Sequence, residues 1–177
     1  MDEDVVLVDA QGQVKRGLNN AILTRPKLQA HQLGLLHSAV SVLLFDDDKL
    51  LLQRRADTKY HSAGLWTNTS CTHPRVDEAP LKSAKRCLTY EMGVTCSLRE
   101  VHSFVYRVQV SPELLEHEYD RVFVGDWDGT PVPNPQEVSE WRWASITDLL
   151  QEIEGQPDHF TEWLKLCLPE VLLSSGR

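Results

Sequence analysis

The chain has 177 residues, and its 18 Lys and Arg against 26 Asp and Glu give a formal net charge of −8. Hydrophobic residues make up 41% and charged residues 25%, which is typical of globular proteins and excludes a disordered tail, a collagen-like repeat and a polytopic membrane protein. The length predicts one domain, residues 1–177, and the acidic balance argues against a nucleic-acid-coating surface. An anionic ligand would need metal ions or a few placed cations.

The chain ends and the cysteines indicate a cytoplasmic protein. The first residues, MDEDVVLVDA, are acidic and do not fit a secretory signal or an Arg-rich transit peptide, and the last residues, SSGR, match no anchor. The four cysteines form no CxxC pair and are too sparse for a disulfide scaffold, so we expect reduced thiols.

The first half of the chain predicts strands, a polar loop and one helix. An apolar run at 5–8 followed by a turn at 10–13 indicates a hairpin. The expected elements that follow are strands at 37–45 and 50–55, a loop at 56–72 and a helix at 78–92. In this helix Leu81, Ala84, Leu88 and Met92 share one face, and Gly93 stands where a C-terminal cap belongs.

The second half predicts more sheet, then two helices. The expected strands are 103–110, 117–126 and 139–143, and the expected helices are 145–153 and 158–173. Ser145 and Asp148 resemble a capping box, and Pro169 predicts a kink. The pattern as a whole indicates an α+β domain with a mixed sheet.

Two residue pairs with i, i+2 spacing could carry chemistry. Cys71 and His73 form one pair and Glu116 and Glu118 the other, and in extended chain each pair projects to one side. With His31 and His37 they would supply the nitrogen and oxygen ligands that suit Mn²⁺, Zn²⁺ or Mg²⁺. Composition alone leaves simpler alternatives open. They are the histidines as surface or hydrogen-bonded side chains, Cys71 as a small buried residue, the glutamates as a solvated edge strand, Trp163 as core, and Arg54, Arg55 and Lys59 as solubilising charges.

The segment 72–94 resembles a Nudix box, G-x5-E-x7-R-E-U-x-E-E-x-G-U, where U is apolar. The matching positions are Glu78, Arg86, Leu88, Glu91, Gly93 and Val94. Thr72 replaces the opening glycine, and Cys87 and Tyr90 replace two glutamates of the box. The helix pattern is kept while two metal carboxylates are missing, so ordinary nucleotide hydrolysis is disfavoured.

Neighbouring motifs resemble the type I isopentenyl-diphosphate isomerases of the Nudix superfamily. The motifs are GLLHSAVSVLLFD (34–46), QRRADTKYH (53–61), GLWTNTSCTHP (64–74), EHEYDRVF (116–123) and FTEW (160–163). They occur in family order over residues 27–170. The resemblance implies a Nudix-like mixed sheet sandwiched by helices, with residues 1–30 as an N-terminal hairpin or arm closing over the site.

The resemblance also implies an activity and residue roles. The family interconverts isopentenyl and dimethylallyl diphosphate, in isoprenoid biosynthesis, by adding and removing protons on opposite faces of the substrate. By family position, Cys71 acts on one face, Glu118 with Tyr106 acts on the other, and Trp163 forms an aromatic wall. The implied ligands of one divalent metal (Mn²⁺, Zn²⁺ or Mg²⁺) are His31, His37, His73, Glu116 and Glu118. Which of Cys71 and Glu118 gives the proton in the forward direction is left open.

The diphosphate is expected to carry its own Mg²⁺, contacted by Glu91, and to meet Lys27, Arg55, Lys59 and Arg86. Cys87 stands where many relatives have arginine, which predicts weaker substrate binding. The resemblance further implies no flavin, no membrane or nucleic-acid partner, and a monomer or weak dimer. Two alternatives remain, namely a Nudix hydrolase of unassigned substrate and a catalytically silent metal-binding module.

Overall fold

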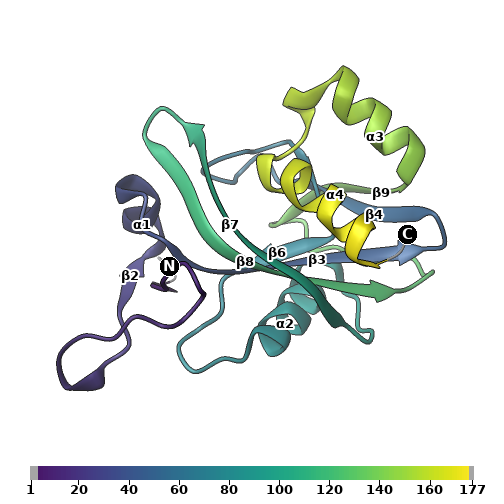
Figure 1. Ribbon diagram of the computed structural model, residues 1–177. Helices are drawn as coiled ribbons and strands as arrows, with labels where there is room; N and C mark the ends of the chain where they lie inside the picture. The colour runs from purple at the N-terminus through teal and green to yellow at the C-terminus, as the bar shows by residue number, and fades with distance from the viewer. Residues whose placement is uncertain (1–3, 176–177) are drawn as a thin grey trace.

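A mixed β-sheet packed between helices forms the body of the protein in the computed structural model (Figure 1), which describes residues 4–175. Residues 1–3 and 176–177 of the predicted domain lie outside the described part. The strands of the sheet are β3 (His37–Asp46), β4 (Lys49–Arg55), β5 (Trp66–Thr67), β6 (Ser70–Thr72), β7 (Arg99–Ser111), β8 (Leu114–Asp126) and β9 (Val138–Ser145). The predicted α+β class is confirmed. Within residues 4–175 no helix is long and apolar enough to cross a membrane.

Helices cover both faces of this sheet, which explains why the sequence of β3 is almost continuously apolar. Leu43 and Phe45 pack in a cluster with α3 (Ile146–Gly155) and α4 (Glu162–Ser175). Val42 and Leu44 pack in a second cluster with α2 (Pro80–Met92). Figure 1 shows α2 on one side of the sheet and α3 and α4 on the other. Alternate residues of a strand point to opposite faces, so burial of both faces removes the alternation.

The sheet opens between β3 and β4, and this opening places β6. The two strands pair at only two positions beside their turn, Phe45 with Leu50 and Asp46 with Lys49. Farther along, β3 pairs with β6 on this side and, in parallel, with β8 on the other. Thr69 Oγ1 fills the opening, because it accepts from Leu44 N of β3 at 2.9 Å and donates to Leu51 O of β4 at 2.7 Å. The predicted loop at 56–72 is therefore wrong at its end, where β5 and β6 form.

The helix boundaries differ from prediction for local reasons. Helix α2 begins at Pro80 and not at 78, because Ala79 before the proline is extended (ψ 138°). Gly93 caps its end at φ 67°, as predicted. Helix α4 begins at Glu162 and not at 158, because Phe160 is extended and bridges to Trp66, and a short 3₁₀ turn, η2 (Pro157–His159), precedes it. Pro169 lies inside α4.

The N-terminal segment forms a small unit beside the sheet (Figure 1). Strand β1 (Asp4–Val6) pairs with β2 (Thr24–Pro26), and a 3₁₀ turn, η1 (Leu18–Asn20), lies between them. The predicted turn at 10–13 is present, with Asp9 N bonded to Gln13 O at 2.9 Å. Helix α1 (Lys27–Leu33), which was not predicted from the sequence, follows β2 directly. This helix carries Lys27 and His31 toward the sheet.

Candidate active site

Three adjacent strands align a histidine, a glutamate and a tyrosine in one row. His37 of β3 and Tyr106 of β7 are both register partners of Glu118 on β8. Tyr106 Oη donates to Glu118 Oε2 at 2.6 Å. Glu116 precedes Glu118 by two residues and is 3% exposed on the same side of β8. The strand register therefore places both carboxylates of the predicted pair in the interior.

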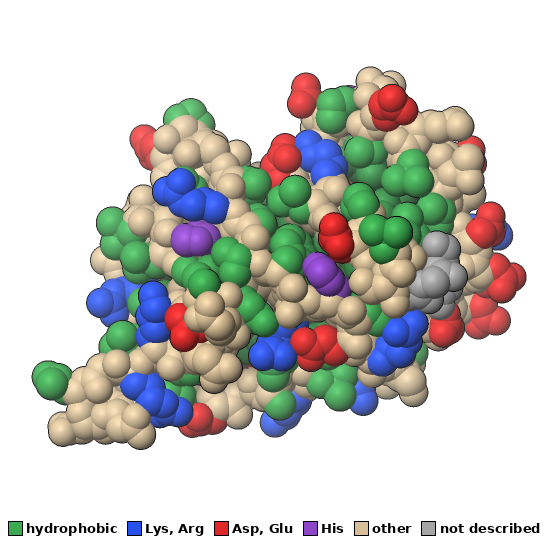
Figure 2. All heavy atoms as spheres, in the orientation of Figure 1, with side chains coloured by type: hydrophobic (Ala, Val, Ile, Leu, Met, Phe, Trp, Pro, Cys, Tyr) green, Lys and Arg blue, Asp and Glu red, His purple; other side chains and the backbone are tan. Residues whose placement is uncertain are grey.

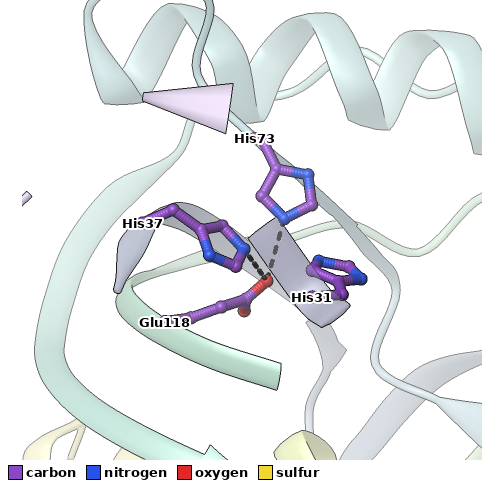
Figure 3. Close-up of side chains that lie close together, drawn as sticks. All are labelled: His31, His37, His73 and Glu118. Atoms are coloured by element: carbon purple, nitrogen blue, oxygen red, sulfur yellow. Dashed lines mark hydrogen bonds and ion pairs between the residues drawn. The ribbon is translucent and has the colours of Figure 1, made fainter. Parts of the chain in front are cut away.

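Two further histidines reach this row from other elements (Figure 3). His73, just after β6, lies with Nε2 2.9 Å from Glu118 Oε1, and His37 Nε2 is 3.4 Å from the same oxygen. His31 of α1 lies with Nε2 3.3 Å from Glu116 Oε2. The ligand atoms of His31, His37, His73 and Glu118 all lie within 4.8 Å of one another. The structure thus brings together the five predicted metal ligands, all buried.

The donor atoms of this cluster fit a divalent metal. His31 Nε2, His37 Nε2 and Glu116 Oε2 are buried and form no hydrogen bond within residues 4–175. Leaving such atoms without a partner in the interior is costly. The other ring nitrogen of His37 lies 2.8 Å from Leu35 O, which fixes the ring with Nε2 toward the carboxylates. The His/Glu cluster could therefore hold a metal ion.

Burial and neighbouring side chains shift the pKa values of Glu116 and Glu118 in opposite directions. Burial alone would raise the pKa of Glu118, but the adjacent imidazoles of His37 and His73 outweigh it and hold that pKa well below the usual range. Burial and repulsion from Glu118 raise the pKa of Glu116 to about 8. Burial lowers the pKa of His31 to about 2 and of His73 to about 3, so both imidazoles are neutral and able to ligate.

Cys71 faces the same interior space as Glu118. Both line a cavity of about 220 Å³, together with Tyr106, Trp163 and members of the His/Glu cluster. Cys71 lies on β6 and pairs with Ser41 of β3, so it enters through the opening of the sheet. Burial, followed by the nearby Glu91, raises the pKa of the Cys71 thiol to about 12. The thiol therefore keeps its proton.

Trp163 lies at the start of α4 and is 4% exposed. Its indole ring contacts the guanidinium of Arg55, whose Cζ is 5.2 Å from the ring centroid. Burial raises the pKa of Tyr106 well above its usual range, with the Glu118 charge as the next cause, so its hydroxyl stays protonated. The inner cavity is thus bounded by an aromatic wall and by groups that keep their protons.

A second, outer cavity of about 640 Å³ carries most of the predicted cations. Its basic lining residues are Lys27, Lys59, Arg75 and Arg86. Lys27, Lys59, Cys71, Thr72 and Glu91 line both cavities. The predicted diphosphate residue Arg55 lines the inner cavity alone.

Glu91 of α2 lies where the two cavities meet. Gln53 Nε2 donates to Glu91 Oε2 at 2.7 Å and to Thr69 O at 2.9 Å. Burial raises the pKa of Glu91, partly offset by the Gln53 hydrogen bond. Lys59, which lines both cavities, forms an ion pair with Glu137. A carboxylate and an ammonium thus face the same entrance.

Arg86 is held by Glu78, another charged residue that matches the Nudix box. Its Nε and Nη2 donate to the two oxygens of Glu78, each at 2.9 Å, and Nη2 also donates to His73 O at 3.2 Å. Arg86 therefore contacts the backbone of His73, a residue of the His/Glu cluster, and also lines the outer cavity. Its predicted contact with a diphosphate stays a prediction.

The Glu78–Arg86 pair predicts an acid-dependent loss of stability. The hydrogen bonds from Arg86 lower the pKa of Glu78 from 4.5 to about 2. The contribution of the ionised Glu78 to the free energy of unfolding is therefore complete above about pH 4.5 and is lost as the pH falls toward 2. We expect Glu78→Gln to lower the free energy of unfolding by about 1–2 kcal/mol at pH 7 and by less at pH 3, as measured by urea denaturation. The exposed Glu113→Gln should change neither value. A difference that does not vary with pH would contradict this assignment.

Comparison with known proteins now decides the family. A NUDIX domain matches residues 35–164. Isopentenyl-diphosphate Delta-isomerase 2 of Aromatoleum aromaticum is 44% identical over 173 residues, covering 97% of this chain and 88% of that protein. The isopentenyl-diphosphate Delta-isomerase of Serratia proteamaculans is 46% identical over 172 residues, covering 97% and 92%.

The chain belongs to the isopentenyl-diphosphate Delta-isomerase family. The predicted resemblance is confirmed, and so is the Nudix-like fold. DR0079 from Deinococcus radiodurans superposes with a TM-score of 0.70 at 17% identity, covering 93% of this chain and 96% of that one. A MutT NUDIX hydrolase from Burkholderia pseudomallei gives a TM-score of 0.62 at 16% identity, with coverage of 77% and 98%. These two structures show the fold alone.

Several supporting residues of this isomerase-family site were not predicted from sequence. His61 lies with Nε2 3.0 Å from Glu116 Oε1, and the hydroxyl of Tyr60 is 2.7 Å from His31 Nδ1. Gln53, which binds Glu91, was also missed. Tyr60 and His61 lie in the expected loop, where no periodicity shows which side chains point inward, whereas Gln53 lies in strand β4 as a polar residue after an apolar run. Only their position inside the QRRADTKYH motif marks them in the sequence.

Proposed function

We propose that this chain interconverts isopentenyl and dimethylallyl diphosphate by a 1,3-allylic proton shift. The observation that carries this proposal is that the Cys71 thiol and the Glu118 carboxylate line one small cavity from two different strands. Proton transfer in both senses needs a donor and an acceptor on the two sides of the same substrate. Hydrolysis by the usual Nudix-box carboxylates would leave this pair without a role.

The reaction adds one proton and removes another. A proton added to the terminal CH₂ carbon of isopentenyl diphosphate makes a tertiary carbocation at the branched carbon. Loss of a proton from the neighbouring CH₂ group next to the diphosphate-bearing carbon then gives the allylic product. Cys71 serves one face and Glu118 the other, while Tyr106, hydrogen-bonded to Glu118 Oε2, relays the proton there. No atom is gained or lost overall.

A carbocation in this cavity must be kept from water and from nucleophiles. The Trp163 ring lines the cavity and is buried, so it offers a stabilising surface that does not add to the cation. A desolvated cation–π contact contributes about 2 kcal/mol. The high pKa of the Cys71 thiol supports the same requirement, because a thiol is a far weaker nucleophile than a thiolate.

We place the diphosphate in the outer cavity and the hydrocarbon in the inner one. Because the chain carries a net charge of −8, an anionic diphosphate needs a locally positive site, and the cations of the outer cavity provide it. On the face shown in Figure 2, basic and acidic side chains are interspersed and no single basic patch covers the surface. Glu91, at the junction, would hold a Mg²⁺ ion that arrives with the diphosphate. Lys27 and Lys59 would contact the diphosphate oxygens.

The His/Glu cluster would hold one further divalent ion, Mn²⁺, Zn²⁺ or Mg²⁺. When bound, this ion would anchor the Glu118 carboxylate and polarise it. The protein's own residues orient the cluster through strand register and through the contacts of His37 and Tyr106. Because α1 supplies His31 to the cluster and Lys27 to both cavities, we propose that the N-terminal segment closes over the site as an arm.

An assay of the products tests this function. We expect the protein, incubated with isopentenyl diphosphate and Mg²⁺, to form the acid-labile allylic diphosphate without releasing phosphate. In D₂O, proton NMR should show solvent deuterium in the product. Phosphate release without an allylic product would instead support a Nudix hydrolase, and neither product would support a silent metal-binding module.

A further inference from the structure

The segment between β4 and β5 is tied down so that His61 points inward. Arg55 Nε donates to Ser62 O and Arg55 Nη2 donates to His61 O, both at 3.2 Å. Ser62 has φ +50°, a left-handed conformation that residues other than glycine rarely adopt, and it turns the chain directly after His61. His61 is 7% exposed and lines the inner cavity. This loop therefore holds a polar ring in the interior.

His61 contacts the metal cluster through one oxygen of Glu116. Its Nε2 lies 3.0 Å from Glu116 Oε1, whereas the other oxygen, Oε2, lies 3.3 Å from His31 Nε2. His31, His61 and Glu116 have ligand atoms within 4.8 Å of one another, and the group formed by His37, His73 and Glu118 joins this one through His31. Glu116 thus contacts His61 through Oε1 and the other ligands of the cluster through Oε2.

The hydroxyl of Ser62 favours one direction for the hydrogen bond between His61 and Glu116. Glu116 Oε2 is buried without a hydrogen bond among the described residues, and Oε1 faces His61. The second ring nitrogen of His61, Nδ1, lies 3.3 Å from Ser62 Oγ, which can donate to it. With Nδ1 accepting, Nε2 carries the proton and donates to Glu116 Oε1. Outer contacts of this kind orient ligating carboxylates and tune metal affinity.

We infer that His61 is a positioning residue, which holds one oxygen of Glu116 so that the other faces the metal. This inference rests on the metal site of the proposed function and adds a residue to it. Tyr60, the preceding residue, places its hydroxyl 2.7 Å from His31 Nδ1. One short loop therefore supports two ligands, Glu116 and His31, that come from other parts of the fold. Strand register turns Glu116 toward the interior, and the contact with His61 then fixes which of its two oxygens faces the cluster.

Two substitutions separate the hydrogen bond from the volume of the ring. His61→Phe keeps a ring of similar size and removes the donor, whereas His61→Gln places an amide donor near the position of Nε2. Metal-free full-length protein is titrated with Mn²⁺ alone, and free Mn²⁺ is followed by EPR. We expect His61→Phe to weaken Mn²⁺ binding about 10- to 100-fold, His61→Gln to stay close to wild type, and the exposed His159→Ala to be unchanged.

Each outcome of this titration tests either the role of His61 or the metal site itself. Equal Mn²⁺ affinity of wild type and His61→Phe would overturn the role of His61 and leave the metal site standing. Equal weakening by His61→Phe and His61→Gln would also overturn it, because the donor would then be irrelevant. Absence of Mn²⁺ binding by wild type would overturn the metal site itself. Thermal melts of each variant, followed by circular dichroism, confirm that the protein used is folded.

Discussion

Replacing Cys71 by alanine is expected to lower kcat for isopentenyl diphosphate about 10²- to 10⁴-fold, the range over which a positioned acid or base contributes. The thiol lines the same inner cavity as the Glu118 carboxylate and keeps its proton because burial raises its pKa to about 12. It belongs to neither group of metal-ligating atoms. Metal content, measured by plasma mass spectrometry, should therefore stay at the wild-type level.

Cys96→Ala is the matched control for this experiment. Cys96 is a free, partly buried thiol that packs against the α2 cluster and lines neither the inner nor the outer cavity. It removes the same atom at a distance from the chemistry, so activity should be retained. Full turnover by Cys71→Ala would remove Cys71 from the mechanism, and loss of metal from that variant would show that its thiol supports the cluster.

Glu118→Gln is expected to lose both chemistry and metal. The carboxylate accepts from Tyr106 through Oε2 and lies 2.9 Å from His73 through Oε1, so an amide of the same shape places a donor or a neutral acceptor in each position. We expect kcat to fall by about 10²-fold or more. Affinity for Mn²⁺ should fall at least about 10-fold, because the charge that offsets the cation is gone. Steady-state kinetics and the EPR titration measure the two effects.

The control for this variant is Glu100→Gln. Glu100 lies on the neighbouring strand β7, is exposed, and pairs with Arg121 at 3.1 Å. It removes one carboxylate charge from the same sheet without touching the cavity, so both readouts should match wild type. If Glu118→Gln binds metal as tightly as wild type, the ligand role is wrong, whereas normal turnover would exclude Glu118 from proton transfer.

The residues that strand geometry controls could be predicted from the sequence. The i, i+2 spacing of Glu116 and Glu118 put both carboxylates on one side of a strand, and the structure has them there. Cys71 and His73 likewise reach one cavity. The family motifs then connected segments that are far apart in the chain. Two local features, the helix cap at Gly93 and the capping contact of Ser145 with Asp148, were also predicted from the sequence.

What the sequence did not predict depends on contacts between distant segments. Helix α1 has only seven residues, too few to show a helical period, yet it delivers His31. Strand β6 forms because β4 leaves β3, and side-chain hydrogen bonds from Thr69 to both strands span that opening. The same applies to His61, whose inward direction is set by Arg55 and by the left-handed turn at Ser62.

A crystal structure of the metal-loaded protein with a non-reactive analogue of isopentenyl diphosphate tests the central claim most directly. We predict that the five-carbon chain lies between Cys71 Sγ and the Glu118 carboxylate, with the Trp163 ring against it and the diphosphate among the cations of the outer cavity. A hydrocarbon chain bound outside the inner cavity, or Cys71 and Glu118 on the same side of it, would contradict the proposed mechanism.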